Sequence, residues 1–305
     1  MRVAAVQMST SPDDRPANLR RAEAHVARAV AAGAELVVLP ELFDTGYCYE
    51  LSARTSAESL EGAAGSWLGR MARRHRVWLA GCVYERNEAG CFDAFVLQGP
   101  EGQRAVHRKR VPVGPERFFF EPGDDPMVVE TPLGRVALVI CAESEHAALL
   151  AEVVRARPRI VLIVYAAPTR HRLLEQLLGV AYREHLRRLQ LQWARCSGAP
   201  VVSASMTGPW RSGLPGIPGL KVRSRFQGQS AIVDARGQIL ASLDREEGVL
   251  GAELDLGEPR PIDPVPSGPW VGRPIRGWAR GALSLVGRCG ARSYDAWQRR
   301  KRAAE

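Results

Sequence analysis

The feature that most constrains this chain is a short apolar run at residues 134–140, rich in β-branched side chains and followed directly by Cys141. Such a run, bounded by turn residues, is typical of a strand buried inside a sheet. The carboxyl end of a central strand is where open α/β sheets bind ligands, and we expect the N-terminus of a helix to follow at once. Cys141 is therefore a candidate nucleophile. The alternative is a small buried apolar residue, as cysteine commonly is.

The composition indicates a globular protein with a substantial core. The chain has 305 residues and is 46% hydrophobic, which suits one large domain or two small ones. No run approaches the roughly 18 uninterrupted apolar residues of a membrane span. The first residues read as a strand and not as a signal peptide. We therefore expect a soluble, cytoplasmic protein with no membrane partner.

Cysteine and histidine are used without metal-site spacing. The six cysteines and six histidines are scattered, with no CxxC pair and no HExxH pattern. This distribution favours reduced thiols and argues against structural zinc. We expect neither a metal nor a cofactor.

Positive charge is concentrated near the C-terminus. Of the net charge of +9, residues 258–305 supply +6, from ten basic and four acidic side chains, so that residues 1–257 supply only +3. The same 258–305 segment is rich in proline and contains Trp270, Trp278 and Trp297. We expect one domain over residues 1–257 and a basic C-terminal tail over residues 258–305.

The order of expected elements predicts an α/β protein. Helix–strand alternation gives way to consecutive strands, which suits mixed sheets with helices on their outer faces. The expected helices are 16–32, 66–74, 146–155 and 171–196, and the expected strands are 2–8, 36–39, 77–83, 92–97, 104–109, 128–130, 134–140, 160–165, 200–205, 229–233, 238–243 and 249–256. A Gly/Pro-rich stretch, 207–219, is expected to be a loop.

Two more polar side chains stand at expected strand ends. Glu41 follows the strand at 36–39, and Lys109 ends the strand at 104–109. Taken alone, Glu41 also fits a solvated loop and Lys109 an exposed basic run. Only three of the 42 basic residues are lysines, and a lysine at this position suits a need for a compact point charge.

These residue types suit the cleavage of an amide or nitrile. The reaction needs a nucleophile, a proton shuttle and a cation where negative charge develops. A cysteine of ordinary pKa, about 8.5, is mostly neutral at pH 7. Glu41 would take the proton of Cys141 during attack and return it to the leaving group, and Lys109 would stabilise the oxyanion.

In their order and spacing, Glu41, Lys109 and Cys141 resemble the nitrilase or carbon–nitrogen hydrolase superfamily. The resemblance covers roughly residues 1–257 and includes the segments 3–8, 108–124 and 226–234. It implies a four-layer αββα sandwich. It also implies a homodimer or higher homo-oligomer, associated symmetrically through the helices that cover the sheets.

The resemblance also suggests supporting residues. Glu116 matches a second family glutamate that would orient Lys109 or the substrate, and its alternative is a surface partner of Arg117. Ala142 would supply a backbone N–H to the oxyanion. Glu143 occupies a position that is commonly acidic, with a structural or supporting role. The candidate pocket residues are Tyr47, Glu143, Ala166 and Trp210.

The expected activity is hydrolysis of a linear amide or N-carbamoyl (ureide) substrate through a Cys141 thioester. A nitrilase or an amide-forming acyltransferase would use the same residues, and we rank the nitrilase lower because the Trp-Glu that commonly follows the nucleophile in that branch is absent. The changed residues 142–148 leave the substrate open. A catalytically inactive relative acting as a binding protein is the alternative of another class.

The composition of the tail suggests two possible partners. Its arginines and tryptophans suggest contact with nucleic acid or an acidic membrane. However, the tail contains no recognised nucleic-acid fold, and C-terminal extensions in related folds tend to wrap a neighbouring subunit, with the tryptophans as buried anchors. We expect the tail to pack on a partner subunit and expect no nucleic-acid partner.

Overall fold

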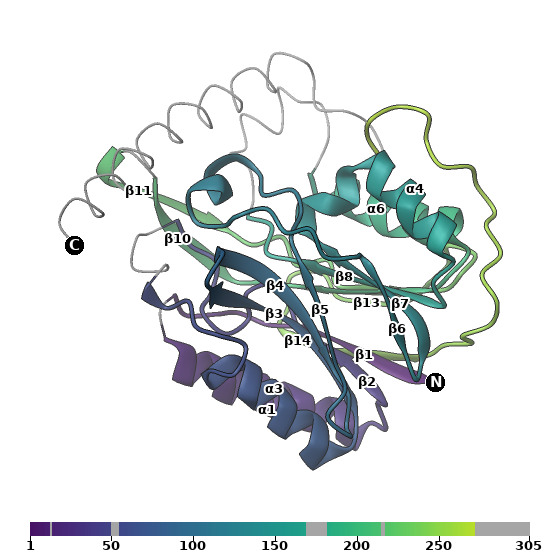
Figure 1. Cartoon of the computed structure of the whole chain (residues 1–305), viewed down its shortest axis with the longest axis horizontal. Helices are drawn as coiled ribbons and strands as arrows, with labels where there is room; N and C mark the ends of the chain where they lie inside the picture. The colour runs from purple at the N-terminus through teal and green to yellow at the C-terminus, as the bar shows by residue number, and fades with distance from the viewer. Residues whose placement is uncertain (13, 50–54, 169–181, 215–216, 272–305) are drawn as a thin grey trace.

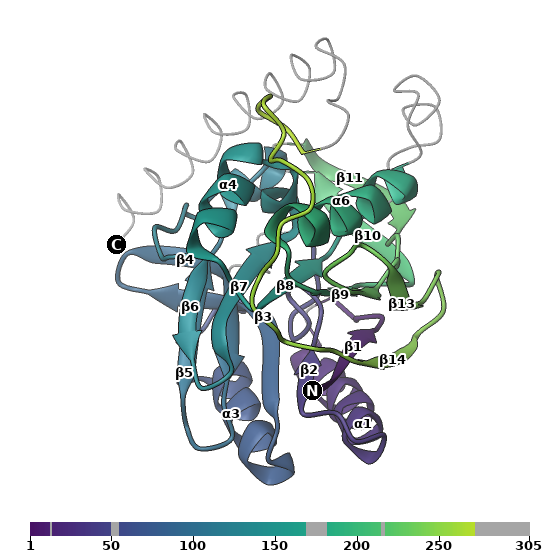
Figure 2. The same ribbon diagram turned by 90° about the vertical axis from the view of Figure 1, so that its right-hand side faces the viewer.

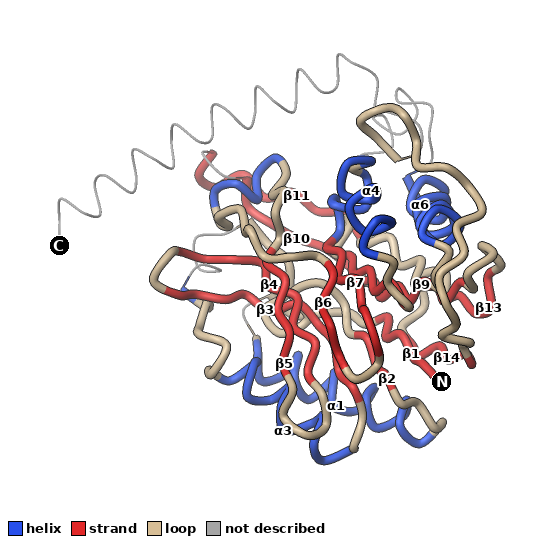
Figure 3. Tube along the Cα trace, turned by 45° about the vertical axis from the view of Figure 1, so that its right-hand side comes forward, coloured by secondary structure: helices blue, strands red, loops and turns tan. Residues whose placement is uncertain are grey.

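Two six-stranded sheets pack face to face, and helices cover the outer face of each (Figures 1 and 3). This computed structural model describes residues 1–12, 14–49, 55–168, 182–214 and 217–271. The predicted four-layer αββα architecture is confirmed. Among the described residues, no helix is both long and apolar enough to cross a membrane.

The first sheet has the strand order β14-β1-β2-β3-β4-β5, in which β1, β2 and β3 run parallel and the other pairs are antiparallel. Helices α1 (Arg15–Ala31) and α3 (Ala63–His75) cover its outer face (Figure 1). Its strands are β1 (Arg2–Gln7), β2 (Leu36–Val38), β3 (Trp78–Asn87), β4 (Gly90–Gln98), β5 (Arg104–Arg108) and β14 (Gly248–Glu253).

The second sheet has the order β13-β12-β9-β8-β7-β6, with β7, β8 and β9 parallel. Helices α4 (Ala147–Ala156) and α6 (Tyr182–Ser197) cover its outer face (Figure 3). Its strands are β6 (Val128–Thr131), β7 (Gly134–Ile140), β8 (Ile160–Tyr165), β9 (Val201–Ser205), β12 (Ala231–Val233) and β13 (Ile239–Ser242).

Successive side chains along a strand point alternately into two different hydrophobic cores. In β1, Val3 and Ala5 belong to the core between the sheets, whereas Ala4 and Val6 belong to the core under α1 and α3. Strand β7 is buried over its last five residues, as expected for a strand covered on both faces. The sandwich therefore fixes the carboxyl ends of β2 and β7 within two rigid sheets.

The prediction of a loop at residues 207–219 is wrong. Strands β10 (Pro209–Leu214) and β11 (Ile217–Arg225) form an antiparallel hairpin outside the two large sheets. Gly and Pro usually break strands, but a two-stranded hairpin has two free edges, where a proline without an N–H is tolerated. The hairpin packs Trp210 and Val222 onto the cluster of aromatic residues described below.

Most other predicted elements are confirmed to within a few residues, which is the usual variation in element ends. The strand at 160–165 coincides with β8, and the helix at 146–155 with α4. The helix expected at 171–196 is confirmed from residue 182, and its first part lies outside the described residues.

Residues 258–271 contact their own chain. They run beside α4 and α6 in Figure 2, drawn in yellow-green. Asp263 forms an ion pair with Arg195 of α6 at 2.6 Å. Near the end of this segment, Trp270 forms an isolated antiparallel β-bridge with His146. The Val271 N–H donates to the Glu145 carbonyl at 2.8 Å. The rest of the predicted tail, with Trp278 and Trp297, lies outside the described residues.

Candidate active site

Cys141 occupies a strained turn at the end of β7. Its φ is +49°, in the left-handed region that a non-glycine residue occupies at a cost. The short 3-10 helix η2 (Cys141–Glu145) begins at this residue, so the thiol stands where the strand gives way to a helical turn. Cys141 is 9% exposed, whereas Glu41 and Lys109 are fully buried.

Ser144 holds this turn. Its hydroxyl donates to the Cys141 carbonyl at 2.6 Å and accepts from the Tyr165 hydroxyl at 3.1 Å. Its own carbonyl accepts from the Trp193 indole N–H at 2.7 Å. Because Tyr165 ends β8 and Trp193 lies on α6, the turn is fixed to a neighbouring strand and to a covering helix.

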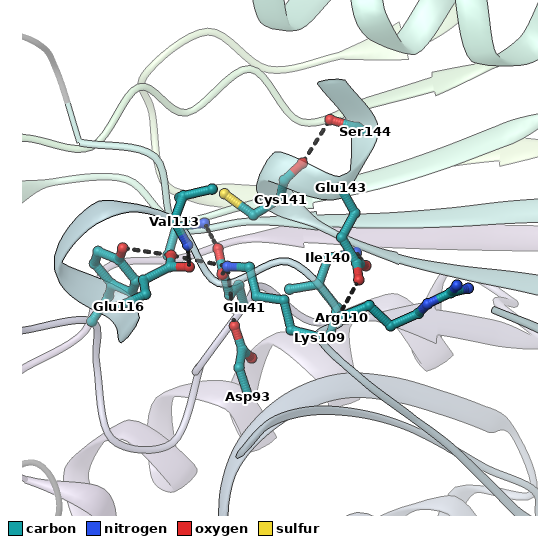
Figure 4. Close-up of polar contacts among 12 residues, drawn as sticks. Glu41, Asp93, Lys109, Arg110, Val113, Glu116, Ile140, Cys141, Glu143 and Ser144 are labelled. Carbon is teal, nitrogen blue, oxygen red and sulfur yellow. Dashed lines mark hydrogen bonds and ion pairs between the residues drawn. The ribbon is translucent and has the colours of Figure 1, made fainter. Parts of the chain in front are cut away.

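The Lys109 ammonium lies among three carboxyl groups (Figure 4). Its Nζ is 2.8 Å from Glu41, 2.9 Å from Glu116 and 3.4 Å from Asp93. All four residues are at most 1% exposed. Burial by itself lowers the pKa of Lys109, but the surrounding carboxylates, Glu116 first, raise it well above its usual value. The lysine is therefore a fixed cation.

Glu41 links the two sheets. It follows β2 of the first sheet, and its Oε2 accepts a 2.5 Å hydrogen bond from the backbone N–H of Ala166, directly after β8 of the second. Figure 4 shows the Cys141 sulfur beside the carboxylate–ammonium cluster. The structure thus brings Glu41, Lys109 and Cys141 together, as the sequence predicts.

The Cys141 thiol is neutral in this environment. Burial, followed by the charge of Glu41, raises the pKa of Cys141 well above its usual value. Lys109 lowers it, but to a smaller extent than these two effects raise it. A neutral thiol is a poor nucleophile, so attack needs a base, and the carboxylate whose charge acts most strongly on the thiol is Glu41.

Glu116 is buried in the same cluster and is not a surface partner of Arg117. It lies on the 3-10 helix η1 (Gly114–Phe118) and accepts hydrogen bonds from the Tyr47 hydroxyl at 2.7 Å and the Val113 N–H at 2.9 Å. Arg117 donates instead to the carbonyl of Pro112. The Val113 N–H and the Tyr47 hydroxyl thus fix the Glu116 carboxylate, and this carboxylate positions the Lys109 ammonium.

Glu143 does not line a pocket. Its fully buried carboxylate accepts from the backbone N–H groups of Ile140 and Arg110, at 2.8 and 2.7 Å, and contacts His107 Nε2 at 3.0 Å. In Figure 4 the side chain extends toward Ile140 and Arg110, away from the Cys141 sulfur. These contacts correct the pocket-lining expectation and fit the structural role, because they fasten the end of β7 to the segment after β5.

Ala142 follows Cys141 within η2. The first N–H groups of a helix have no partner inside the helix. The Ala142 N–H is therefore in the right part of the chain to serve an oxyanion, which remains a prediction.

Aromatic side chains pack next to the Lys109 cluster, which they meet through the hydrogen bond from Tyr47 to Glu116. Trp210 of β10 donates its indole N–H to the Tyr47 carbonyl at 2.8 Å. Tyr49 packs against Trp210 and Phe119, with ring centroids 5.8 and 6.1 Å apart. Tyr47, Trp210 and Ala166 thus share one buried cluster. Residues 50–54 and 169–181, next in the chain to Tyr49 and Pro168, are not among those described.

Sequence reasoning missed Asp93 and Tyr49. Asp93 is the one acidic residue in the apolar stretch 91–97 of β4, and a lone carboxylate in a buried strand was the signal that could have indicated it. Tyr49 has no comparable signal in the sequence, because only the fold places it against Tyr47. Among the residues that the structure describes, no group of His, Cys, Asp or Glu has the arrangement of a metal site.

The fold and these side chains define a class of αββα proteins in which a cysteine meets a lysine and carboxylates at the ends of the strands. The profile of the carbon–nitrogen hydrolase family matches residues 2–262. The chain therefore belongs to the carbon–nitrogen hydrolase family of the nitrilase superfamily, and it is an enzyme of that superfamily.

Named relatives include both nitrilases and amidases. A nitrilase of Pyrococcus abyssi is 35% identical over 127 residues, which span 41% of this chain and only 48% of that protein. The omega-amidase NIT2 of Xenopus tropicalis is 27% identical over 84% of this chain and 88% of its own length.

A solved structure of a mutant amidase from Nesterenkonia sp. AN1, in which acrylamide has added to the active-site cysteine, matches with a TM-score of 0.66. It is 25% identical and covers 84% of this chain and 93% of that one.

Proposed function

We propose that this protein hydrolyses linear amides or N-carbamoyl compounds through a thioester on Cys141. The observation that supports this most directly is that the buried carboxylate of Glu41, 2.8 Å from the Lys109 ammonium, lies beside the Cys141 sulfur in Figure 4. A base, a nucleophile and a cation within one small buried region are what acyl transfer from nitrogen requires.

In the first step, Glu41 takes the thiol proton as the Cys141 sulfur forms a bond to the substrate carbonyl carbon. The carbonyl π electrons move to oxygen, and the resulting oxyanion is stabilised by Lys109 and by the Ala142 N–H. The tetrahedral intermediate then collapses, the C–N bond breaks, and Glu41 returns the proton to the departing nitrogen. Ammonia or an amine leaves, and a thioester remains.

In the second step, Glu41 takes a proton from water as the water oxygen attacks the thioester carbonyl. A second tetrahedral intermediate forms and the C–S bond breaks. The sulfur recovers its proton through Glu41, and the acid is released. General acid–base help of this kind contributes about 10² to 10⁴ in rate, and one oxyanion donor about 10² to 10³.

Two further reactions use the same residues. A nitrilase would add Cys141 to a C≡N carbon, and an acyltransferase would admit an amine in place of water to the thioester. The relatives include both nitrilases and amidases. We place the amide reaction first because Ala142 stands where nitrilases commonly have the Trp of a Trp-Glu pair, of which only the acidic residue is kept, as Glu143.

The test is capture of the acyl-enzyme. The protein is exposed to a panel of amides, ureides and nitriles and analysed by intact-mass and peptide mass spectrometry, with the product acid measured in parallel. We expect an acyl mass on Cys141 and no turnover by Cys141→Ala. Cys196→Ser is the matched control, because Cys196 lies on α6 and its thiol donates to the Pro264 carbonyl. Full turnover by Cys141→Ala would overturn the proposal.

We also propose that the protein is a cytoplasmic homodimer or higher oligomer that associates through the helices covering the sheets, with the tail packed on a partner subunit. Sedimentation velocity tests this by comparing the full chain with a chain ending at Val271, which keeps the contacts of residues 258–271 with their own chain. Dissociation on truncation is expected. An unchanged oligomer would exclude the tail from the interface, and a full chain that sediments as a monomer would exclude the oligomer.

A further inference from the structure

The Lys109 cluster contains more acid than base. Three carboxyl groups face a single ammonium, and each residue is at most 1% exposed. If all three carboxyls were ionised, the buried group would have a net charge of −2 before the thiol is counted. A buried charge without a partner is costly, and such a group takes up a proton instead. At least one carboxyl in this cluster is therefore neutral.

The hydrogen-bond donors around each carboxyl identify which of the three is neutral. Glu116 accepts from Lys109, Tyr47 and Val113. Glu41 accepts from Lys109 and from the Ala166 N–H. Asp93 has the longest of the three lysine contacts, at 3.4 Å, and its Oδ1 accepts from no donor in the described structure. Asp93 therefore has the least stabilisation for a negative charge.

The position of the two acids supports the same choice. Asp93 and Glu41 both contact the Lys109 ammonium, so two like charges would share one small site, and a proton on one of the acids removes that repulsion. Asp93 Oδ1 is buried and accepts from no donor in the structure, and protonation would turn the acid into a donor. Burial, followed by the charge of Glu41, raises the pKa of Asp93 well above its usual value.

We propose that Asp93 is a positioning residue that stays protonated and donates a hydrogen bond to Glu41. Glu41 is then the ionised base. Asp93 also completes the set of side chains that hold the Lys109 ammonium in place. This inference rests on the proposed function only in the role that it gives to Glu41. The groups that face Asp93 are Glu41, Lys109, Glu116 and Cys82.

The backbone supports a positioning role. Strands β4 and β5 are antiparallel, and just past their last pair the Lys109 N–H donates to the Asp93 carbonyl at 2.9 Å. The two residues therefore stand opposite each other, and the Asp93 side chain lies beside the lysine stem. A neutral acid here restrains the ammonium without taking it from Glu41 and Glu116.

The test compares Asp93→Asn and Asp93→Ala with the wild-type protein by the rate of iodoacetamide alkylation of Cys141 between pH 6 and 10, followed by peptide mass spectrometry. Alkylation needs no substrate, so it reports on Asp93 even if no amide is turned over. An asparagine amide keeps the neutral charge and the donor. We expect the Asn profile to coincide with that of the wild type, and the Ala variant to be alkylated about tenfold more slowly at pH 7.

An ionised Asp93 gives a different result. Removing its charge beside the thiol would then move the Asn profile about one pH unit or more toward acid, with about tenfold faster alkylation at neutral pH. That shift would overturn the proposal. So would an Asn variant as impaired as the Ala variant, or an Ala variant like the wild type. If the Ala variant does not fold, Asp93→Ser replaces it and the Asn profile still decides the charge.

Discussion

Glu41 accepts a 2.5 Å hydrogen bond from the backbone N–H of Ala166. This single bond joins the chain after β2 in one sheet to the chain after β8 in the other. The same carboxylate reaches Lys109 at 2.8 Å through its other oxygen. The orientation of the proposed base is therefore set by the packing of the two sheets and not by either strand alone.

Glu41→Gln should nearly abolish turnover while leaving the fold intact. The amide has the size of the carboxylate but cannot take the thiol proton, and we expect kcat to fall by about 10² to 10⁴. Steady-state kinetics measure the loss, and the melting temperature checks the fold. Glu88→Gln, at an exposed position, is the control and should keep full activity. Wild-type kcat in the Glu41→Gln variant would exclude Glu41 as the base.

Lys109→Met should destabilise the protein strongly. The substitution keeps a buried side chain of similar length but removes the cation from between Glu41 and Glu116. Breaking a buried ion pair by removing one partner costs about 3–5 kcal/mol. Urea unfolding measures the change in the free energy of unfolding. Lys221→Met, at an exposed lysine, should change it by less than about 0.5 kcal/mol, and equal effects of the two variants would contradict the buried-cation account.

Tyr47→Phe should lower catalysis moderately. The Tyr47 hydroxyl donates to Glu116 at 2.7 Å, and burial raises the pKa of Tyr47 well above its usual value, so that it remains a donor. A hydrogen bond to a charged group contributes about 1.5–3 kcal/mol, which predicts a loss in kcat of roughly tenfold to a hundredfold. Steady-state kinetics measure the loss in kcat, and urea unfolding measures a loss of stability of about the same free energy. An unchanged kcat would exclude Tyr47 from the support of Glu116.

Ser144→Ala should loosen the turn at Cys141. The hydroxyl bonds the Cys141 carbonyl and the Tyr165 hydroxyl, and the variant leaves both without this partner. We expect a stability loss of about 1–3 kcal/mol and a lower kcat, because the strained φ of Cys141 is no longer supported. Thermal unfolding and kinetics measure the two effects. A stable variant with full activity would show that the strand and helix hold the turn unaided.

Stability should depend on pH through Asp93. Its pKa is raised in the folded protein, so the native state holds a proton that the unfolded chain loses above about pH 4. The stabilisation from this proton is fully present below the unfolded pKa and is lost as pH rises through the folded pKa.

Asp93→Asn has no such proton. Relative to the wild type, the free energy of unfolding of Asp93→Asn should therefore increase between pH 4 and pH 8. Urea titrations at several pH values measure this difference. A gap between the two proteins that stays constant with pH would contradict the raised pKa of Asp93.

The local elements and the three central site residues could be predicted because each leaves a local pattern. Buried strands such as β7 and β8 are continuous apolar runs, and an amphipathic helix such as α1 repeats its apolar positions. Glu41, Lys109 and Cys141 each stand at the end of such a strand, where α/β folds place their sites. The hairpin β10–β11 was missed because its glycines and prolines, read locally, indicate a loop.

What the sequence by itself determined is the strand that ends at Cys141, the order of elements, and the residue types that acyl transfer needs. Only the tertiary structure decided that Asp93 faces Lys109, that Glu143 turns away from the thiol, and that Ala166 fixes Glu41. The reason is physical. Side-chain periodicity is encoded over a few residues. The Asp93–Lys109 contact depends instead on the pairing of β4 with β5. The contact between Glu41 and Ala166, which are 125 residues apart, depends on how the two sheets pack, and that packing depends on all of their buried side chains together.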